Sequence, residues 1–133
     1  IEMRSFSEVV ENSDILSVHM PATPETIDSI NFEVFNKMKK NSILINVGRG
    51  ELVNEADLVR ALKDKVIRAA ALDVRKAEPP VIGELEELDN LILTPHIAGI
   101  TYESQLAINK ILVENIDLVL NGKNATHAVG IIS

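Results

Sequence analysis

Residues 42–50 read SILINVGRG, an apolar run that passes directly into an arginine between two glycines. Three more short runs are just as rich in Ile, Leu and Val. The four runs are Ile15–Met20, Ser42–Val47, Ala69–Val74 and Leu91–Thr94. None alternates clearly between apolar and polar residues, and continuous runs of this length are typical of parallel strands buried on both faces. We therefore predict a sheet of four parallel strands.

Helical patterns lie between these runs. A short helix is predicted over Ser7–Asn12, and Asn31 and Asn54 are good N-caps in front of two apolar stripes. The longest helix is predicted over Thr101–Leu120, before Asn121-Gly122. Strands that alternate with helices predict an α/β fold, a partial doubly wound parallel sheet with helices on both faces where they remain. The tail, residues 123–133, fits either a final strand or a disordered segment.

The long helix has an apolar stripe along one face. Two further apolar residues, Ile108 and Val113, lie outside this stripe, so we expect the helix to have neighbours on two sides. The stripe consists of Leu106, Ala107, Ile111, Leu112, Ile116 and Val119.

Composition and charge exclude several classes of protein. The net charge of −7 disfavours nucleic acid and anionic membranes as partners. The sequence has no cysteine, which excludes disulfides and thiolate metal sites and fits a cytoplasmic location; we predict no metal site. The apolar runs are too short to span a bilayer. The first residues do not resemble a signal peptide and lack an initiator Met, so we expect the chain to be part of a longer one.

Polar or glycine-containing elements follow each predicted strand. In open parallel sheets the carboxyl ends of the strands share one edge, where ligands bind. A guanidinium at Arg49 can bind a carboxylate bidentately. His96 is a natural proton donor and acceptor, with Glu78 as a possible carboxylate partner, and Asp73 can accept a hydrogen bond from a carboxamide. The alternatives are a surface Arg in a glycine-rich turn, a structural His and a turn or N-cap Asp.

Taken together, these motifs resemble one family, the D-isomer-specific 2-hydroxyacid dehydrogenases. The run Asn46–Gly50 resembles its Arg signature, Ala70–Pro79 its Glu signature, and Leu93–Gly99 its His signature, in the family's order. Upstream, His19–Thr26 resembles the loop that contacts the cofactor. The resemblance runs from about Ile15 to Gly122. Three signatures in order are far more specific than a single glycine-rich loop.

The resemblance implies a domain arrangement. Residues 1–122 would form the C-terminal part of a Rossmann-like NAD-binding domain, with a long helix at about 101–121 that crosses back to the substrate domain. Residues 123–133 would be a tail. The glycine-rich phosphate loop and the substrate domain are absent from the 133 residues. We therefore expect this chain alone to be inactive, to bind NAD weakly and to self-associate.

The resemblance also implies an activity. The parent would be an oxidoreductase that transfers a hydride between NAD(H) and a small D-2-hydroxy or 2-oxo acid, such as phosphoglycerate or glyoxylate and hydroxypyruvate. Full members of the family usually form homodimers. The alternative is an NAD(H)-sensing protein of the corepressor type on the same scaffold.

Site residues follow from the same resemblance. Arg49 would bind the carboxylate and carbonyl oxygen of the substrate, His96 would be the general acid and base, and Glu78 would orient His96. One departure from the family pattern is Arg75-Lys76-Ala77, where an aromatic and an acidic residue are common. The cofactor contacts would be Met20, Pro21, Thr26, Val47, Gly48, Arg49, Asp73, His96, Ala98 and Gly99.

Overall fold

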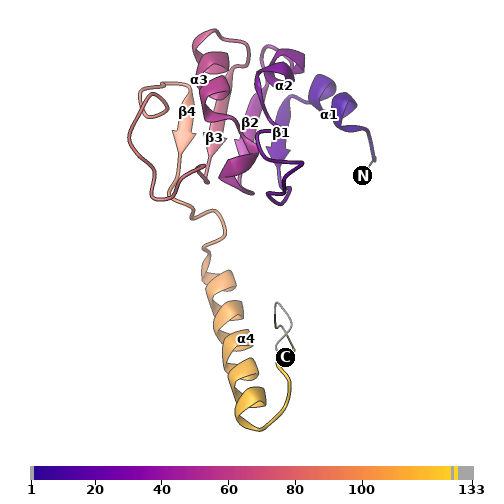
Figure 1. Ribbon diagram of the computed structural model, residues 1–133, viewed down its shortest axis with the longest axis vertical. Coiled ribbons are helices and arrows are strands. Elements are labelled where there is room, and N and C mark those ends of the chain that lie inside the picture. Colours follow the sequence, from indigo (N-terminus) through magenta and orange to yellow (C-terminus); the bar gives the residue numbers. More distant parts are fainter. Residues whose placement is uncertain (1, 127, 129–133) are drawn as a thin grey trace. The chain divides into compact units, whose positions relative to one another are not determined.

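The computed structural model describes residues 2–126 and 128 and divides into two compact units, Ile1–Ile97 and Ala98–Ser133. The first unit holds a sheet of four parallel strands in the order β1-β2-β3-β4, seen as adjacent arrows in Figure 1. The prediction of a four-stranded parallel α/β sheet is confirmed. The strands are β1 (Ile15–Val18), β2 (Ile43–Asn46), β3 (Ala69–Leu72) and β4 (Leu91–Leu93).

Each strand ends one or two residues earlier than predicted, because the chain turns away at the carboxyl edge. At the end of β2 the side chain of Asn46 is fully buried. Its Nδ2 donates to the carbonyl oxygen of Arg49 at 2.8 Å, and its Oδ1 accepts from the backbone N–H of Gly48 at 3.1 Å. These two bonds close the turn that carries Arg49.

Three α-helices belong to the first unit: α1 (Phe6–Asn12), α2 (Phe32–Lys37) and α3 (Glu55–Lys63). A short 3-10 helix, η1 (Gly50–Leu52), follows the Arg49 turn. The predicted N-caps are confirmed, because Asn31 Oδ1 accepts from the N–H groups of Glu33 and Val34, and Asn54 Oδ1 accepts from that of Asp57. The polar residue at each helix start therefore determines where the helix begins.

The core of this unit lies on one face of the sheet only. Burial alternates along β1, β2 and β3, and the other face leaves Ile15 59 % and Ile92 66 % exposed. The expectation that both faces are covered is therefore wrong for the described part of this unit. The strand order follows the chain order, so successive right-handed crossovers place α2 and α3 on the same face, where they contact each other.

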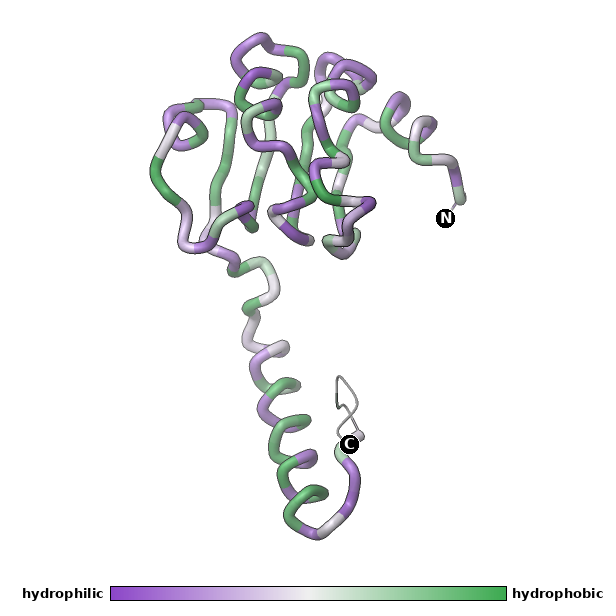
Figure 2. The backbone as a smooth tube through the Cα atoms, in the orientation of Figure 1, coloured by the Kyte–Doolittle hydropathy of each residue, from purple (hydrophilic) through white to green (hydrophobic). Residues whose placement is uncertain are grey.

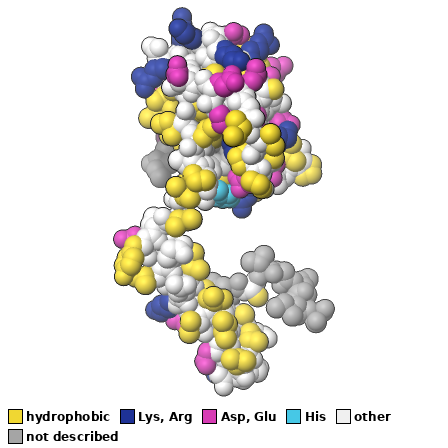
Figure 3. All heavy atoms as spheres, turned by 90° about the vertical axis from the view of Figure 1, so that its left-hand side faces the viewer, with side chains coloured by type: hydrophobic (Ala, Val, Ile, Leu, Met, Phe, Trp, Pro, Cys, Tyr) yellow, Lys and Arg dark blue, Asp and Glu magenta, His cyan; other side chains and the backbone are white. Residues whose placement is uncertain are grey.

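The second unit contains α4 (Tyr102–Leu120), which begins as predicted after the N-cap Thr101. Thr101 and Ser104 form a capping box, and Ser104 Oγ also donates to the carbonyl oxygen of Gly99 at 2.8 Å. No residue of α4 is buried. Its apolar residues colour the backbone green along the helix in Figure 2, and hydrophobic side chains form yellow patches in Figure 3. None of the described helices combines the length and apolar character needed to cross a membrane.

The predicted tail is described only in part. Thr126 donates its backbone N–H to Asn115 Oδ1 at 2.7 Å, which returns the chain to α4. The prediction for the last residues of the tail falls outside the described residues.

Candidate active site

The three predicted catalytic residues come together at the carboxyl edge of the sheet. A cavity of about 170 Å³ is lined by Arg49, Glu78 and His96, together with Gly50 and Arg75 among others. These residues follow three different strands, so their meeting depends on the parallel arrangement. The prediction that these three residues meet at this edge is confirmed, whereas their catalytic roles stay predictions.

His96 and Glu78 form a direct pair. The distance from His96 Nδ1 to Glu78 Oε2 is 2.8 Å, and Glu78 Oε1 accepts the backbone N–H of Arg75 at 2.9 Å. The hydrogen bond with His96, followed by that with the Arg75 backbone, lowers the pKa of Glu78 below its usual value. An ionised carboxylate only accepts hydrogen bonds, so Nδ1 carries a proton. Nε2 is then the ring nitrogen through which a proton can be exchanged with a ligand.

The backbone around His96 is held by Asp73. His96 has a φ of 54°, in the left-handed region that L-residues rarely adopt. Its N–H donates to the carbonyl oxygen of Asp73 at 2.8 Å, while Asp73 Oδ1 accepts from the N–H of Ile97 at 2.9 Å and from the Thr94 hydroxyl. The buried Asp73 carboxylate therefore organises the His96 turn, as in the turn interpretation; its contact with a cofactor stays a prediction.

Arg49 is exposed beside this pair, between two closely packed glycines. A Cβ on Gly50 would lie 2.0 Å from the carbonyl carbon and oxygen of Arg75, so no side chain fits there. Arg49 Nη1 donates to the carbonyl oxygen of Gly48 at 2.8 Å. Among the described residues, its guanidinium forms no ion pair within 4.0 Å. The turn thus presents a cation that an acidic ligand can bind.

A second cavity, of about 530 Å³, adjoins the Arg49 turn. Five predicted cofactor contacts line it, which are Met20, Pro21, Val47, Gly48 and Arg49. His19 also lines it, and its ring Nε2 lies 2.7 Å from Ser17 Oγ. His19 directly follows β1, at the carboxyl edge of the sheet, and this position could have identified it as a candidate site residue.

Five other predicted cofactor contacts do not line this cavity: Asp73 and His96, which form the turn described above, and Thr26, Ala98 and Gly99. The Thr26 hydroxyl donates to the carbonyl oxygen of Pro21 at 2.7 Å and accepts from the N–H of Thr23 at 2.7 Å, so it closes the Pro21–Thr26 loop. Ala98 and Gly99 belong to the second unit. Their contacts with a cofactor stay predictions.

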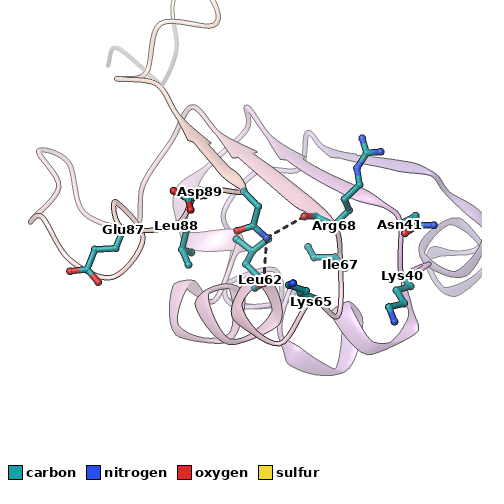
Figure 4. A pocket seen from close by; sticks show the side chains of 10 residues that line it. Lys40, Asn41, Leu62, Lys65, Ile67, Arg68, Glu87, Leu88 and Asp89 are labelled. Atoms are coloured by element: carbon teal, nitrogen blue, oxygen red, sulfur yellow. Dashed lines mark hydrogen bonds between the residues drawn. The ribbon is translucent and has the colours of Figure 1, made fainter.

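A depression of about 540 Å³ lies at the opposite, amino edge of the sheet. Figure 4 shows Arg68 and Lys40 pointing in opposite directions there, while Asn90 donates to the carbonyl oxygens of Leu62 and Arg68. Its charged groups do not converge on one point. The carboxyl edge, where a cation and a His–Glu pair meet, is therefore the better candidate for a reaction site.

Comparison with known proteins identifies the family. Residues 1–98 match the family model for the NAD binding domain of the D-isomer specific 2-hydroxyacid dehydrogenases. The chain is 44 % identical over 123 residues to a D-3-phosphoglycerate dehydrogenase of Methanocaldococcus jannaschii, covering 92 % of this chain and 24 % of that protein.

Solved structures of dehydrogenases and reductases are also similar to this chain. A D-lactate dehydrogenase with NAD+ from Lactobacillus jensenii has a TM-score of 0.87 and 32 % identity over 96 % of this chain and 43 % of that one. An NADPH-dependent glyoxylate/hydroxypyruvate reductase from Sinorhizobium meliloti, in complex with NADP and malonate, has a TM-score of 0.82 and 34 % identity over 93 % and 39 % of the two chains. The present chain thus spans less than half the length of these relatives. It belongs to the family of D-isomer specific 2-hydroxyacid dehydrogenases, matching the NAD-binding domain.

Proposed function

We propose that this chain supplies the proton-transfer and carboxylate-binding groups of an NAD-dependent oxidoreductase that interconverts small D-2-hydroxy acids and 2-oxo acids. The observation that carries this proposal is the His96–Glu78 contact of 2.8 Å in a cavity that Arg49 also lines. A cation for the substrate carboxylate and a group that exchanges protons near neutral pH are what this reaction requires of a protein.

The residues that line the cavity of about 530 Å³ beside the Arg49 turn fit a nicotinamide ring. Met20 and Val47 offer apolar surface, and Val47 is 37 % exposed. Such a surface suits the face of a flat ring, and Arg49 at the border of both cavities can hold the substrate next to it. When bound, the nicotinamide group would supply or accept the hydride.

Each residue has a defined task in the reduction of a 2-oxo acid. The guanidinium of Arg49 binds the carboxylate and orients the carbonyl carbon toward the cofactor side. As the carbonyl carbon gains a hydride, negative charge grows on the oxygen, and His96 Nε2 gives its proton to that oxygen. Glu78 holds Nδ1 and stabilises the imidazolium. In the oxidation direction His96 Nε2 takes the hydroxyl proton back.

The substrate class we propose is small 2-oxo acids such as hydroxypyruvate, glyoxylate and the oxidised form of phosphoglycerate. The relatives named phosphoglycerate dehydrogenase and glyoxylate/hydroxypyruvate reductase support this choice. The test is a panel of these acids, assayed by NADH consumption, on the longest natural protein that contains this chain. NADH binding without turnover of any acid would contradict the proposal and favour the cofactor-sensing alternative.

Arg49 has a matched control. Arg49→Ala should raise KM for the 2-oxo acid and lower kcat, because the lost bidentate contact orients the substrate in both states. Arg68→Ala removes an exposed cation at the opposite edge and should leave both constants unchanged. Equal effects of the two substitutions would show that Arg49 acts only through the net charge.

We also propose that the chain self-associates. Apolar side chains of α4 are widely exposed, including Leu112 at 55 %, Ile116 at 50 % and Val119 at 58 %. Contiguous apolar surface of this kind marks interaction sites. A homodimer is the simplest assembly that would cover it.

A further inference from the structure

Arg75, in the loop that carries Glu78, forms two ion pairs that are shielded from solvent. Its side chain is only 10 % exposed, and its guanidinium is held by two carboxylates from different parts of the chain. Nε and Nη2 donate to the two oxygens of Glu55 at 3.0 and 3.4 Å, and Nη1 donates to Glu86 Oε1. Glu55 opens α3, whereas Glu86 lies in the loop before β4. We call Arg75, Glu55 and Glu86 the Arg75 clamp.

The clamp fixes the backbone of the loop as well as its side chains. Glu55 Oε1 accepts the backbone N–H of Lys76 at 2.9 Å in addition to its bond from Arg75 Nε. Glu86 Oε2 accepts the N–H of Gly83 at 2.7 Å, and its hydrogen bond with the Arg75 side chain, followed by that from Gly83, lowers the pKa of Glu86. Each carboxylate therefore binds both the guanidinium and a loop peptide.

The same residue connects directly to the candidate active site. The backbone N–H of Arg75 donates to Glu78 Oε1, and the other oxygen of that carboxylate faces His96. The next peptide, between Arg75 and Lys76, closes the space over Gly50, next to Arg49. A shift of the Arg75 backbone, which joins these two peptides, would change both the orientation of Glu78 and the turn that carries Arg49.

We propose that Arg75 is a positioning residue, whose ion pairs with Glu55 and Glu86 hold its backbone N–H in place for Glu78 and so orient the carboxylate toward His96. The geometric part of this inference concerns the described chain alone. Its consequence for turnover rests on the function proposed above. Ion pairs with little exposure are screened weakly by solvent, so they can fix a loop where exposed pairs would not.

The titration of Glu78 in the 133-residue chain tests the geometric part. Its side-chain carboxyl carbon can be followed by NMR as the pH is lowered. In Arg75→Met the loop loses both ion pairs, so the bonds from the Arg75 N–H and from His96 weaken and the pKa of Glu78 rises toward its ordinary value. Arg75→Lys keeps a cation for one carboxylate and should give an intermediate value.

A matched control comes from another ion pair between α3 and the loop that carries Glu86. Lys63→Met removes the ion pair with Glu84, whose side chains are 47 % and 68 % exposed, and should leave the titration of Glu78 unchanged. Glu86→Gln removes one of the two clamp carboxylates and keeps the proposal testable if Arg75→Met does not fold. A Glu78 pKa equal to that of the wild type in folded Arg75→Met, or in both Arg75→Lys and Glu86→Gln, would overturn the proposal.

A kinetic measurement separates this inference from the proposed function. In the longer natural protein, Arg75→Met should lower kcat about tenfold with a smaller change in KM, less than the loss of the acid itself would cause. A Glu78 pKa that rises in a protein without 2-oxo acid reductase activity would refute the proposed function and support the positioning role. An active enzyme in which Arg75→Met changes neither the pKa nor kcat would refute the positioning role alone.

Discussion

The imidazole of His96 and the carboxylate of Glu78 meet at 2.8 Å across 18 residues of chain. The pair joins the loop that follows β3 to the turn that follows β4, and both side chains are partly exposed, at 52 % and 38 %. A carboxylate on Nδ1 leaves Nε2 as the ring nitrogen that can exchange a proton with a ligand. This arrangement is the structural basis for the assignment of His96 as the acid and base.

Replacing His96 is the most direct test of that assignment. His96→Ala in the longer natural protein should lower kcat by about 10²–10⁴-fold, the usual contribution of general acid–base catalysis. Binding of NADH should change little, since the imidazole is only one of several groups at that edge. Steady-state kinetics with the best 2-oxo acid and a separate NADH titration measure the two effects. Unchanged turnover would remove His96 from the mechanism.

The lowered pKa of Glu78 predicts a pH-dependent contribution to stability. Because the folded pKa lies below the ordinary value of 4.5, the contribution is present above 4.5 and is lost as the pH falls through the folded value. Thermal unfolding of the wild type should therefore lose stability below about pH 4.5 more than Glu78→Gln does. The difference will be small because Glu78 is exposed to solvent. Parallel curves for the two proteins would show that the pair contributes nothing.

Gly50 should not tolerate any side chain. Gly50→Ala places a methyl group against the Arg75 carbonyl, which is backbone and can yield only if the loop moves. We expect a loss of about 1–3 kcal/mol in the free energy of unfolding, the usual cost of overpacking. Gly83→Ala is the control, since its nearest neighbour, the carbonyl oxygen of Val81, is 4.0 Å away. Chemical denaturation of the wild type, Gly50→Ala and Gly83→Ala measures the free energies of unfolding. Equal midpoints for the wild type and Gly50→Ala would contradict the prediction.

The proposed self-association through α4 can be tested by comparing substitutions of its apolar residues with a control substitution on the same helix. Sedimentation of the wild-type chain should show a dimer or a larger species. Leu112→Glu and Ile116→Lys place charges on the exposed apolar surface and should shift the chain toward the monomer, while circular dichroism should remain unchanged. Lys110→Gln, on the same helix, changes a charged residue that is already exposed and should leave the assembly as it is.

The sequence predicts the meeting of Arg49, Glu78 and His96 because the carboxyl ends of parallel strands must share an edge. Once the four apolar runs are interpreted as parallel strands, topology brings their following residues together. The N-caps Asn31 and Asn54 were predictable for a different reason, since a cap acts within three residues of itself.

Other features depend on geometry that the linear sequence does not hold. The pairing of Arg75 with Glu55 joins residues 20 positions apart through side-chain orientation. The left-handed backbone of His96 follows from hydrogen bonds to Asp73, a residue of another loop. The apolar strands were interpreted as buried on both sides, yet Ile15 and Ile92 are exposed in this unit, because apolar composition does not say which surface covers a strand.

Asp73 accepts hydrogen bonds from Thr94, His96 and Ile97, and these bonds have a consequence for insertions and deletions. They fasten the chain at Thr94, His96 and Ile97, so the turn between them has a fixed length. One residue more or less would carry the imidazole away from Glu78 or break a bond to a buried carboxylate. The segment from Pro80 to Ile82 is exposed throughout and has no comparable hydrogen bond within the described residues. Differences in chain length between homologues should therefore accumulate there, while the spacing from Thr94 to Ile97 stays constant.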